Sequence, residues 1–277
     1  MPSFVRFILG ITMLAALLGV SGCGSSGSAQ VEGELLLTEN RLRQLESALN
    51  AGSLRNATLI KQYADILQDR RPELAPLLRQ LRKETGVESP IYKSLYERFQ
   101  RVRDGSETFE NWTDKVAELQ SIQSGAETSV YNDALSDTVN VIADMSDGEL
   151  ARVNAVSQEQ EQKLNNSKSY GAGSQYVGNP HYGHWSHGSG GSFWAWYGQY
   201  AFFSSMFGSN RYYYNDWSRG RGYSYYHDVG RNSYTSRSQR SAMADVDRRA
   251  QKQFRSLGRY QSPYSKQRSG ASGLSAR

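Results

Sequence analysis

Thiols are almost absent from this chain of 277 residues, which contains a single cysteine, Cys23. One thiol excludes an intramolecular disulfide and a zinc site built on several thiolates, so stability has to come from side-chain packing. Enzyme motifs are lacking too: the sequence contains no Gly-x-Ser-x-Gly turn, no phosphate-binding glycine loop before Lys-Ser/Thr and no His-Glu-x-x-His. We therefore predict that the protein is not an enzyme.

Long hydrophobic runs are scarce as well. One extends from Phe7 to Val20, follows the positive charge of Arg6 and ends in small residues before Cys23. A bilayer-spanning helix needs about 20 apolar residues, so this run is too short for a lasting membrane span. A positive start, a short apolar core and a small-residue exit predict a secretory signal peptide over residues 1–22.

The four residues Val20-Ser21-Gly22-Cys23 resemble the lipobox of bacterial lipoproteins. The resemblance implies that the Cys23 thiol receives a diacylglycerol, that the chain is cut before this residue and that the new amine is acylated. Two or three acyl chains make a stable anchor, at roughly 0.8 kcal/mol for each buried CH₂. Gly24 stands where this family uses aspartate for inner-membrane retention, which implies the outer membrane. The alternative is an ordinary signal peptide with a chance cysteine.

The net charge of +5 hides two halves of opposite sign. Residues 24–168 contain 17 Lys and Arg against 23 Asp and Glu, a net charge of −6. Residues 169–277 contain 14 Lys and Arg against 4 Asp, a net charge of +10, with 14 of the 18 tyrosines and four of the five tryptophans. The basic half is expected to contact an anionic partner, either outside the chain or in its own acidic half.

The acidic half has the periodicity of helices. Leu35, Leu42 and Leu49 recur at seven-residue spacing, and apolar residues at helical spacing continue to Val156. About 135 residues suffice for one helical core. We therefore predict an all-α domain over residues 32–168, as an irregular bundle or as stacked αα-hairpins, preceded by a lipidated flexible Gly/Ser tether over residues 23–31.

Three serines mark expected helix starts in this domain. Ser53 follows a glycine stop and is a plausible N-cap. Ser89 precedes Pro90, which is a strong start signal because proline suits the first helical position. Ser146 and Glu149 have the spacing of a capping box, in which each side chain accepts from the other residue's amide.

The basic half predicts a largely disordered tail. Residues 169–240 are dominated by Gly, Ser, Tyr, Arg and Asn and have no apolar periodicity. Tyrosines and arginines are interleaved in this region, and guanidinium groups stack on tyrosine faces. Many such weak pairs predict multivalent adhesion, within one chain or between chains. The arginines of this region expected to bind a polyanion are Arg211, Arg219, Arg221, Arg231 and Arg237.

A short basic amphipathic helix is expected over residues 241–258, followed by a disordered C-terminus over residues 259–277. Its apolar face contains Met243, Val246, Ala250, Phe254 and Leu257. Its cationic residues, also assigned to polyanion binding, are Arg248, Arg249, Lys252 and Arg255. Such a helix fits an anionic membrane surface or an acidic partner, including the acidic half of this chain.

An aromatic patch is the strongest apolar feature after residue 23. Its members are Phe193, Trp194, Trp196, Tyr197, Phe202, Phe203 and Phe207. Because tryptophan and tyrosine favour the headgroup boundary, the patch is expected to lie in the membrane surface or to contact a partner. The alternative is that it folds back on the helical domain and joins its core.

Three histidines, His181, His184 and His187, lie at three-residue spacing. Imidazole suits zinc, copper and nickel, so one hypothesis is a metal site in a flexible loop. No carboxylate lies inside the motif to orient the rings, as real sites usually require. A second hypothesis is a charge that titrates near neutral pH, and a third is a polar filler role.

These observations favour a non-enzymatic outer-membrane lipoprotein whose basic tail binds an anionic envelope component, with the helical domain as a spacer. Nucleic acid is not an expected partner because of the compartment. One alternative is a scaffold lipoprotein that associates with itself or with partner proteins through Tyr/Arg contacts. Another is metal capture by the three histidines. Apart from the lipid on Cys23, and that metal, no cofactor is expected.

Overall fold

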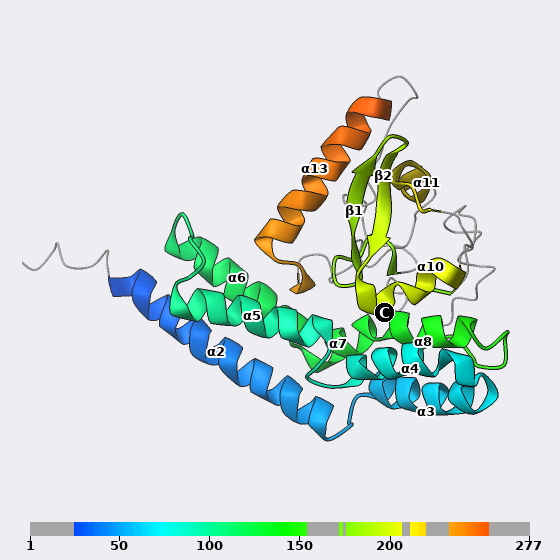
Figure 1. The fold of residues 1–277 in the computed structure, drawn as a ribbon. Coiled ribbons are helices and arrows are strands. Elements are labelled where there is room, and N and C mark those ends of the chain that lie inside the picture. The colour runs from blue at the N-terminus through cyan, green and yellow to red at the C-terminus, as the bar shows by residue number, and fades with distance from the viewer. Residues whose placement is uncertain (1–24, 154–171, 174–175, 207–210, 220–232, 255–277) are drawn as a thin grey trace, which may run out of the picture.

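The computed structural model describes residues 25–153, 172–173, 176–206, 211–219 and 233–254. Most of these residues are helical, and a single two-stranded sheet occurs among them. Figure 1 shows the helices of the acidic half at the base, with the sheet and helix α13 above them. Of the helices in the described ranges, none combines the length and the apolarity needed to cross a bilayer.

The first helix, α2 (Ser25–Asn50), begins earlier than expected. The prediction of a flexible tether over residues 23–31 is therefore wrong from Ser25 onward, and residues 23–24 lie outside the described ranges. The reason is tertiary packing: α2 lies against α6 (Trp112–Gly125), which overrides the weak helix propensity of the Gly/Ser stretch.

The remaining helices of the acidic half pack into one core. They are α3 (Arg55–Arg70), α4 (Ala75–Arg82), α5 (Pro90–Asp104), α7 (Thr128–Ala134) and α8 (Ser136–Asp144), with short 3-10 turns η1 (Pro72–Leu74) and η2 (Lys83–Thr85). The leading helix pairs are α2 with α6 and α3 with α8, neither of which is consecutive. The helices thus form an irregular bundle rather than stacked αα-hairpins.

The expected helix starts have mixed outcomes. The Ser89 hydroxyl accepts from the Ile91 amide at 3.2 Å and caps α5, as predicted. Ser53 is not a cap, because its hydroxyl donates to the Ala48 carbonyl and α3 begins two residues later. Ser146 opens no helix within residues 146–153, although its hydroxyl accepts from the Leu150 amide.

The prediction of disorder over residues 169–240 is wrong for the parts that the structure describes. Strands β1 (Gly183–Gly188) and β2 (Gly191–Trp196) form an antiparallel hairpin. Its two-residue turn ends at Gly191, which has φ +108° and so requires glycine. Short elements follow: η4 (Gly198–Tyr200), α10 (Phe202–Met206) and α11 (Tyr214–Arg219).

Aromatic side chains form the core of this second part. Tyr176 stacks on Tyr182 with ring centroids 3.8 Å apart, and Tyr182 meets Tyr200 edge to face at 4.9 Å. All three are buried, as are Trp194 and Phe203. Since each aromatic residue buries 150–250 Å² in a typical core, a few of them replace the missing aliphatic periodicity.

Polar and apolar contacts join the two parts along a common boundary, which we call the seam. Buried Arg98 of α5 donates to the Glu118 carboxylate at 2.6 Å and to the Ser233 carbonyl. The Tyr234 hydroxyl donates to the Gly125 carbonyl at 2.8 Å, and its ring contacts Tyr131 edge to face. Residues of both parts therefore belong to one continuous core.

Helix α13 (Arg237–Phe254) is the predicted amphipathic helix, with an earlier start. Met243, Val246 and Ala250 are buried, as its apolar face requires, whereas the side chain of Phe254 and the whole of Leu257 lie outside the described part. Arg240 pairs with Glu118 of α6 at 3.3 Å. This ion pair joins the basic half to the acidic half of the same chain.

Candidate functional site: a polar cleft and a cationic helix

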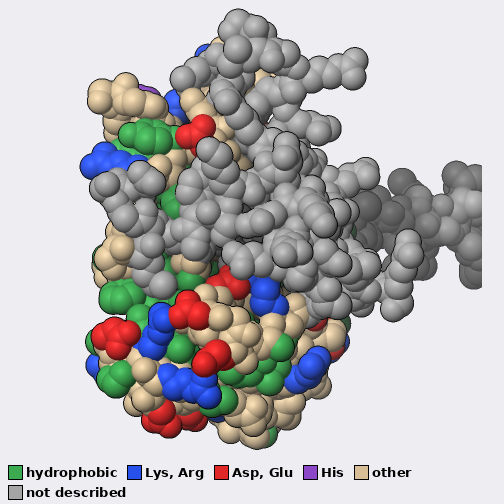
Figure 2. Space-filling view, turned by 90° about the vertical axis from the view of Figure 1, so that its right-hand side faces the viewer, with side chains coloured by type: hydrophobic (Ala, Val, Ile, Leu, Met, Phe, Trp, Pro, Cys, Tyr) green, Lys and Arg blue, Asp and Glu red, His purple; other side chains and the backbone are tan. Residues whose placement is uncertain are grey.

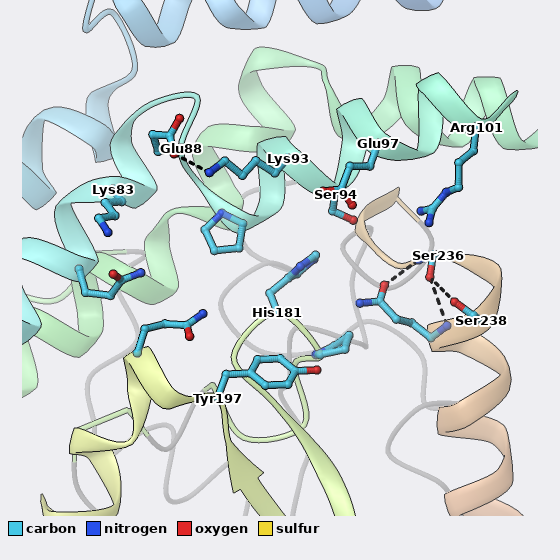
Figure 3. A pocket seen from close by; sticks show the side chains of 15 residues that line it. Lys83, Glu88, Lys93, Ser94, Glu97, Arg101, His181, Tyr197, Ser236 and Ser238 are labelled. Atoms are coloured by element: carbon cyan, nitrogen blue, oxygen red, sulfur yellow. Dashed lines mark hydrogen bonds and ion pairs between the residues drawn. The ribbon is translucent and has the colours of Figure 1, made fainter. Parts of the chain in front are cut away.

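A cleft of about 650 Å³ opens where three segments meet at the seam (Figure 3). One wall runs from the end of α4 and η2 along the exposed side of α5. The opposite wall is made by the residues just before and just after the hairpin, and the third side is the start of α13. The lining is dominated by charged, amide and hydroxyl side chains. Such a surface suits a polar ligand rather than an apolar one.

The α5 wall owes its charge to helical spacing. Lys93, Glu97 and Arg101 follow each other at four-residue intervals and so lie on one face. Lys93 pairs with Glu88 at 2.5 Å, and the pKa of Glu88 is held below its usual range by that hydrogen bond and the nearby ammonium charge. The wall therefore alternates cations with carboxylates.

The opposite wall is positioned by the hairpin. Tyr197 follows β2 directly, and its amide donates to the Tyr182 carbonyl at 3.0 Å, which fixes the chain as it leaves the strand. The centroid of its ring lies 5.6 Å from that of His184 of β1, on which it stacks. Tyr197 and Gln199 both line this wall of the cleft. Figure 3 shows the Tyr197 ring across the cleft from the α5 side chains.

The third side is held by a reciprocal cap at the start of α13. The Gln239 amide donates to the Ser236 hydroxyl at 3.2 Å, and the Ser236 amide donates to the Gln239 side-chain oxygen at 2.8 Å. This is the capping-box arrangement, and it gives acceptors to two backbone N–H groups that have no partner within the helix. Ser238 completes this side of the cleft.

His181 lies buried at the bottom of the cleft. Its Nε2 atom lies 3.0 Å from the Tyr234 carbonyl, so Nε2 carries a proton and donates to that oxygen. Burial lowers the pKa of His181 to about 4; the Tyr234 contact opposes this shift and the Arg98 charge adds to it. The hypothesis that this histidine titrates near neutral pH is therefore wrong.

The structure does not bring the three histidines together. His184 and His187 are three residues apart on β1, so they point to opposite faces of the hairpin, while His181 is turned into the seam. Within the described ranges, no group of three His, Cys, Asp or Glu side chains has the geometry to hold a metal. The metal site shared by the three histidines therefore stays a hypothesis, since the described residues do not assemble its ligands.

The aromatic patch is divided by the fold rather than gathered on one surface. Trp194 and Phe203 are buried in the aromatic core, whereas Tyr197 and Phe202 are partly exposed. Phe193 and Trp196 are half-buried on β2, and Phe207 lies outside the described residues. The expectation of a membrane-surface element is wrong for the buried members, because their rings fill the core of the second part.

The cations assigned to polyanion binding have different surroundings. Arg211 and Arg237 are exposed and lie over the rings of Phe193 at 4.6 Å and Phe109 at 5.2 Å. The exposed cations of α13 beyond these are Arg248, Arg249 and Lys252. The side chain of Arg219, and the whole of Arg221, Arg231 and Arg255, lie outside the described part of the chain.

Several residues of the candidate site were missed from the sequence. Lys83, Lys93 and Arg101 belong to the acidic half, where the net charge drew no attention to individual cations. The four-residue spacing of Lys93, Glu97 and Arg101 was the available signal. Nothing in the sequence could indicate that α13 would start beside them, because the segments are more than 130 residues apart.

The cleft presents cationic, carboxylate, amide and hydroxyl groups together, which suits a polar ligand able to pair with groups of both signs. Cationic and amide donors face the cleft, its buried histidine is neutral and hydrogen-bonded, and the Ser236 hydroxyl is committed to a helix cap. Comparisons of the chain with models of protein families, with curated proteins and with solved structures found no match. The functional assignment therefore depends on the chemistry of these residues.

Proposed function

We propose that this protein is a non-enzymatic lipoprotein of the outer membrane, anchored through lipid on Cys23, that binds an anionic envelope polymer along α13. The lipobox-like Val20-Ser21-Gly22-Cys23 supports the anchor, although these residues lie outside the described part of the structure. The oxygen-rich phosphates of lipopolysaccharide are the expected ligand chemistry, because clustered cations bind polyanions by releasing counterions.

The observation that carries the proposal is the division of α13 into two faces. Its apolar side is buried against the rest of the chain, and Arg240 near its start is held by Glu118. Arg248, Arg249 and Lys252 remain exposed at the other end of the helix, where Arg248 pairs with the half-buried Asp245. The acidic half of the chain thus holds the start of α13 but leaves its last cations accessible to an external partner.

The surroundings of α13 favour this helix over other surfaces. Figure 2 shows acidic and basic side chains interspersed over one face of the helical part, so that face presents no patch of one sign. Of the tyrosines interleaved with arginines, which were expected to contact partner proteins, Tyr214 and Tyr234 are buried within the described part of the chain. Polyanion binding therefore explains the exposed cations better than a Tyr/Arg scaffold does.

The test uses the full chain with Arg248, Arg249 and Lys252 all changed to Gln. Co-sedimentation with lipopolysaccharide-containing vesicles is measured across a salt series. We expect the wild type to lose affinity steeply as salt rises, because bound cations displace counterions, and we expect the variant to bind several-fold more weakly with a shallower salt dependence.

A matched control removes the same charge elsewhere. Arg55, Lys61 and Arg79 are exposed on α3 and α4, and their change to Gln is expected to leave both affinity and salt dependence nearly unaltered. Equal weakening by the two triple variants would mean that only net charge matters and would refute a site on α13. Unchanged binding by the α13 variant would refute it as well.

A further inference from the structure

The starts of α2 and α6 lie together at one end of the helical part. The two helices pair in the same direction, because Gly27 lies beside Trp112 and, farther along, the Gln123 side chain donates to the Thr38 hydroxyl at 3.0 Å. A methyl group added at Gly27 would lie 3.1 Å from the Trp112 indole. The indole therefore rests directly on the first turns of α2.

Trp112 remains 45% exposed despite this contact. It is the first residue of α6, where Asn111 caps the helix by accepting from the Asp114 amide at 2.9 Å. A tryptophan held in place at a helix start, with its ring half in solvent, presents an apolar body and one N–H donor. Tryptophan is enriched at the level of the membrane headgroups, where its apolar ring contacts the acyl chains and its N–H group contacts water or headgroup oxygens.

The reach of the chain places this indole close to Cys23. Cys23 lies four positions before Gly27, and an extended chain covers at most about 3.6 Å per residue. Cys23 therefore lies within about 14 Å of Gly27, against which Trp112 packs. Lipid on Cys23 would hold the indole near the headgroups, because the interfacial region on each side of a bilayer is about 5–8 Å deep and α2 begins only two residues after Cys23.

We propose that Trp112 and the first turns of α2 contact phospholipid headgroups, so that α2 leaves the membrane by its N-terminal end. The proposal rests on the proposed lipidation of Cys23. Glu110 and Asp114 flank the indole, and Glu32 is exposed on the next turn of α2. These carboxylates would be repelled by anionic lipid, so the partner surface is zwitterionic phospholipid.

A second apolar feature of α2 argues against a helix lying flat on the membrane. Leu36 is 64% exposed and lies nine residues after Gly27. At 100° and 1.5 Å per residue it is half a turn away from the Gly27 face and about 13 Å farther along the axis. A flat surface cannot contact both Trp112 and Leu36, so Leu36 supplies a matched control.

The experiment uses the full chain with lipid on Cys23, confirmed by mass spectrometry, in phosphatidylcholine vesicles whose acyl chains are brominated close to the headgroup. Tryptophan fluorescence of the wild type is compared with that of Trp112→Phe and Leu36→Ser. We expect bromine to quench the wild type, Trp112→Phe to lose most of that quenching, and Leu36→Ser to retain it. The other four tryptophans belong to the second part of the fold and provide the unquenched background.

Flotation of the same vesicles separates the two proposals. A chain that floats but shows equal quenching in the wild type and in Trp112→Phe overturns the headgroup contact and leaves the anchor standing. A chain that does not float overturns the anchor and, with it, the membrane contact. Loss of quenching in Leu36→Ser would show that the membrane contact depends on the Leu36 face of α2, which also overturns the end-on contact.

Discussion

Glu84 places a carboxyl group inside the seam. The Tyr200 hydroxyl donates to its Oε1 atom at 2.9 Å and the Ser89 hydroxyl to its Oε2 atom at 3.2 Å. Burial raises the pKa of Glu84 to about 7, and the two hydroxyl contacts only partly offset this effect. Near neutral pH the folded chain therefore keeps a proton on Glu84 that the unfolded chain releases.

The raised pKa predicts a stability that falls with pH. In the unfolded chain the group titrates near 4.5, so its protonated form stabilises the fold fully below that pH, and this contribution is lost as pH rises through about 7. Glu84→Gln keeps an acceptor for Tyr200 without the charge. We expect the variant to gain up to about 3 kcal/mol over the wild type at pH 8 and little at pH 4, measured by urea denaturation.

Glu88→Gln is the control, because Glu88 is close in sequence but pairs with Lys93 in the cleft wall instead of facing the seam. It is expected to leave the alkaline loss of stability in place. A Glu84→Gln variant with the same gain at pH 4 and pH 8 would contradict the assignment, since the gain would then arise from shape rather than from charge.

Buried charges were the residues hardest to foresee from the sequence. Glu84, Arg98 and Glu118 occur on helices rich in exposed charges, and a helical pattern assigns them to the surface. Desolvation of the buried Glu118 would by itself raise its pKa, but the charges and hydrogen bonds of Arg98 and Arg240 together outweigh it and hold the pKa of Glu118 below its usual range. Only the seam, formed by distant segments, reveals these pairings.

At the scale of elements, the capping box of α13 stabilises the first turn of this helix. Ser236→Ala removes the acceptor for the Gln239 amide and is expected to destabilise the start of α13 by about 1 kcal/mol. Hydrogen exchange should then be faster in the first turns of α13 while α5 and α6 are little changed. Ser241→Ala, at an exposed position inside the helix, is the control and should not accelerate exchange.

The sequence predicted elements well wherever apolar periodicity was strong. The leucine stripe that includes Leu42 and Leu49 is buried in α2, and α5 starts at Pro90 as expected. The hairpin was missed because β1 and β2 contain no β-branched residues and no clear alternation of burial. The glycines at Gly188, Gly190 and Gly191 were a turn signal, but the low-complexity composition concealed it.

At the scale of the molecule, neither part is expected to be stable alone. Removing residues 169–277 would leave Arg98 without its Ser233 acceptor and expose Tyr131, which now contacts Tyr234. We expect the shortened chain to melt at a lower temperature in calorimetry and to bind a hydrophobic dye. Removing only residues 259–277 is the control, and it should preserve the melting temperature; equal melting of all three chains would contradict a shared core.

The whole-molecule arrangement was only partly predictable. The opposite charges of the two halves left a contact between them as one of two alternatives, and the Arg240–Glu118 pair provides that contact. The cleft could not be predicted, because its walls come from α5, the hairpin and α13, and no local pattern encodes their meeting. Aromatic residues that resemble those of an adhesive tail instead supply the core that joins the walls.

The seam also sets an order of events for a newly made chain. Arg98 and Ser233 are 135 residues apart, and Gly125 and Tyr234 are 109 apart. Local helix pairs can form early, but closing loops of this length is slow. The first helices therefore keep an uncovered apolar side until α13 has been made and packs against them, and during that interval a chaperone or protease would have access to the chain.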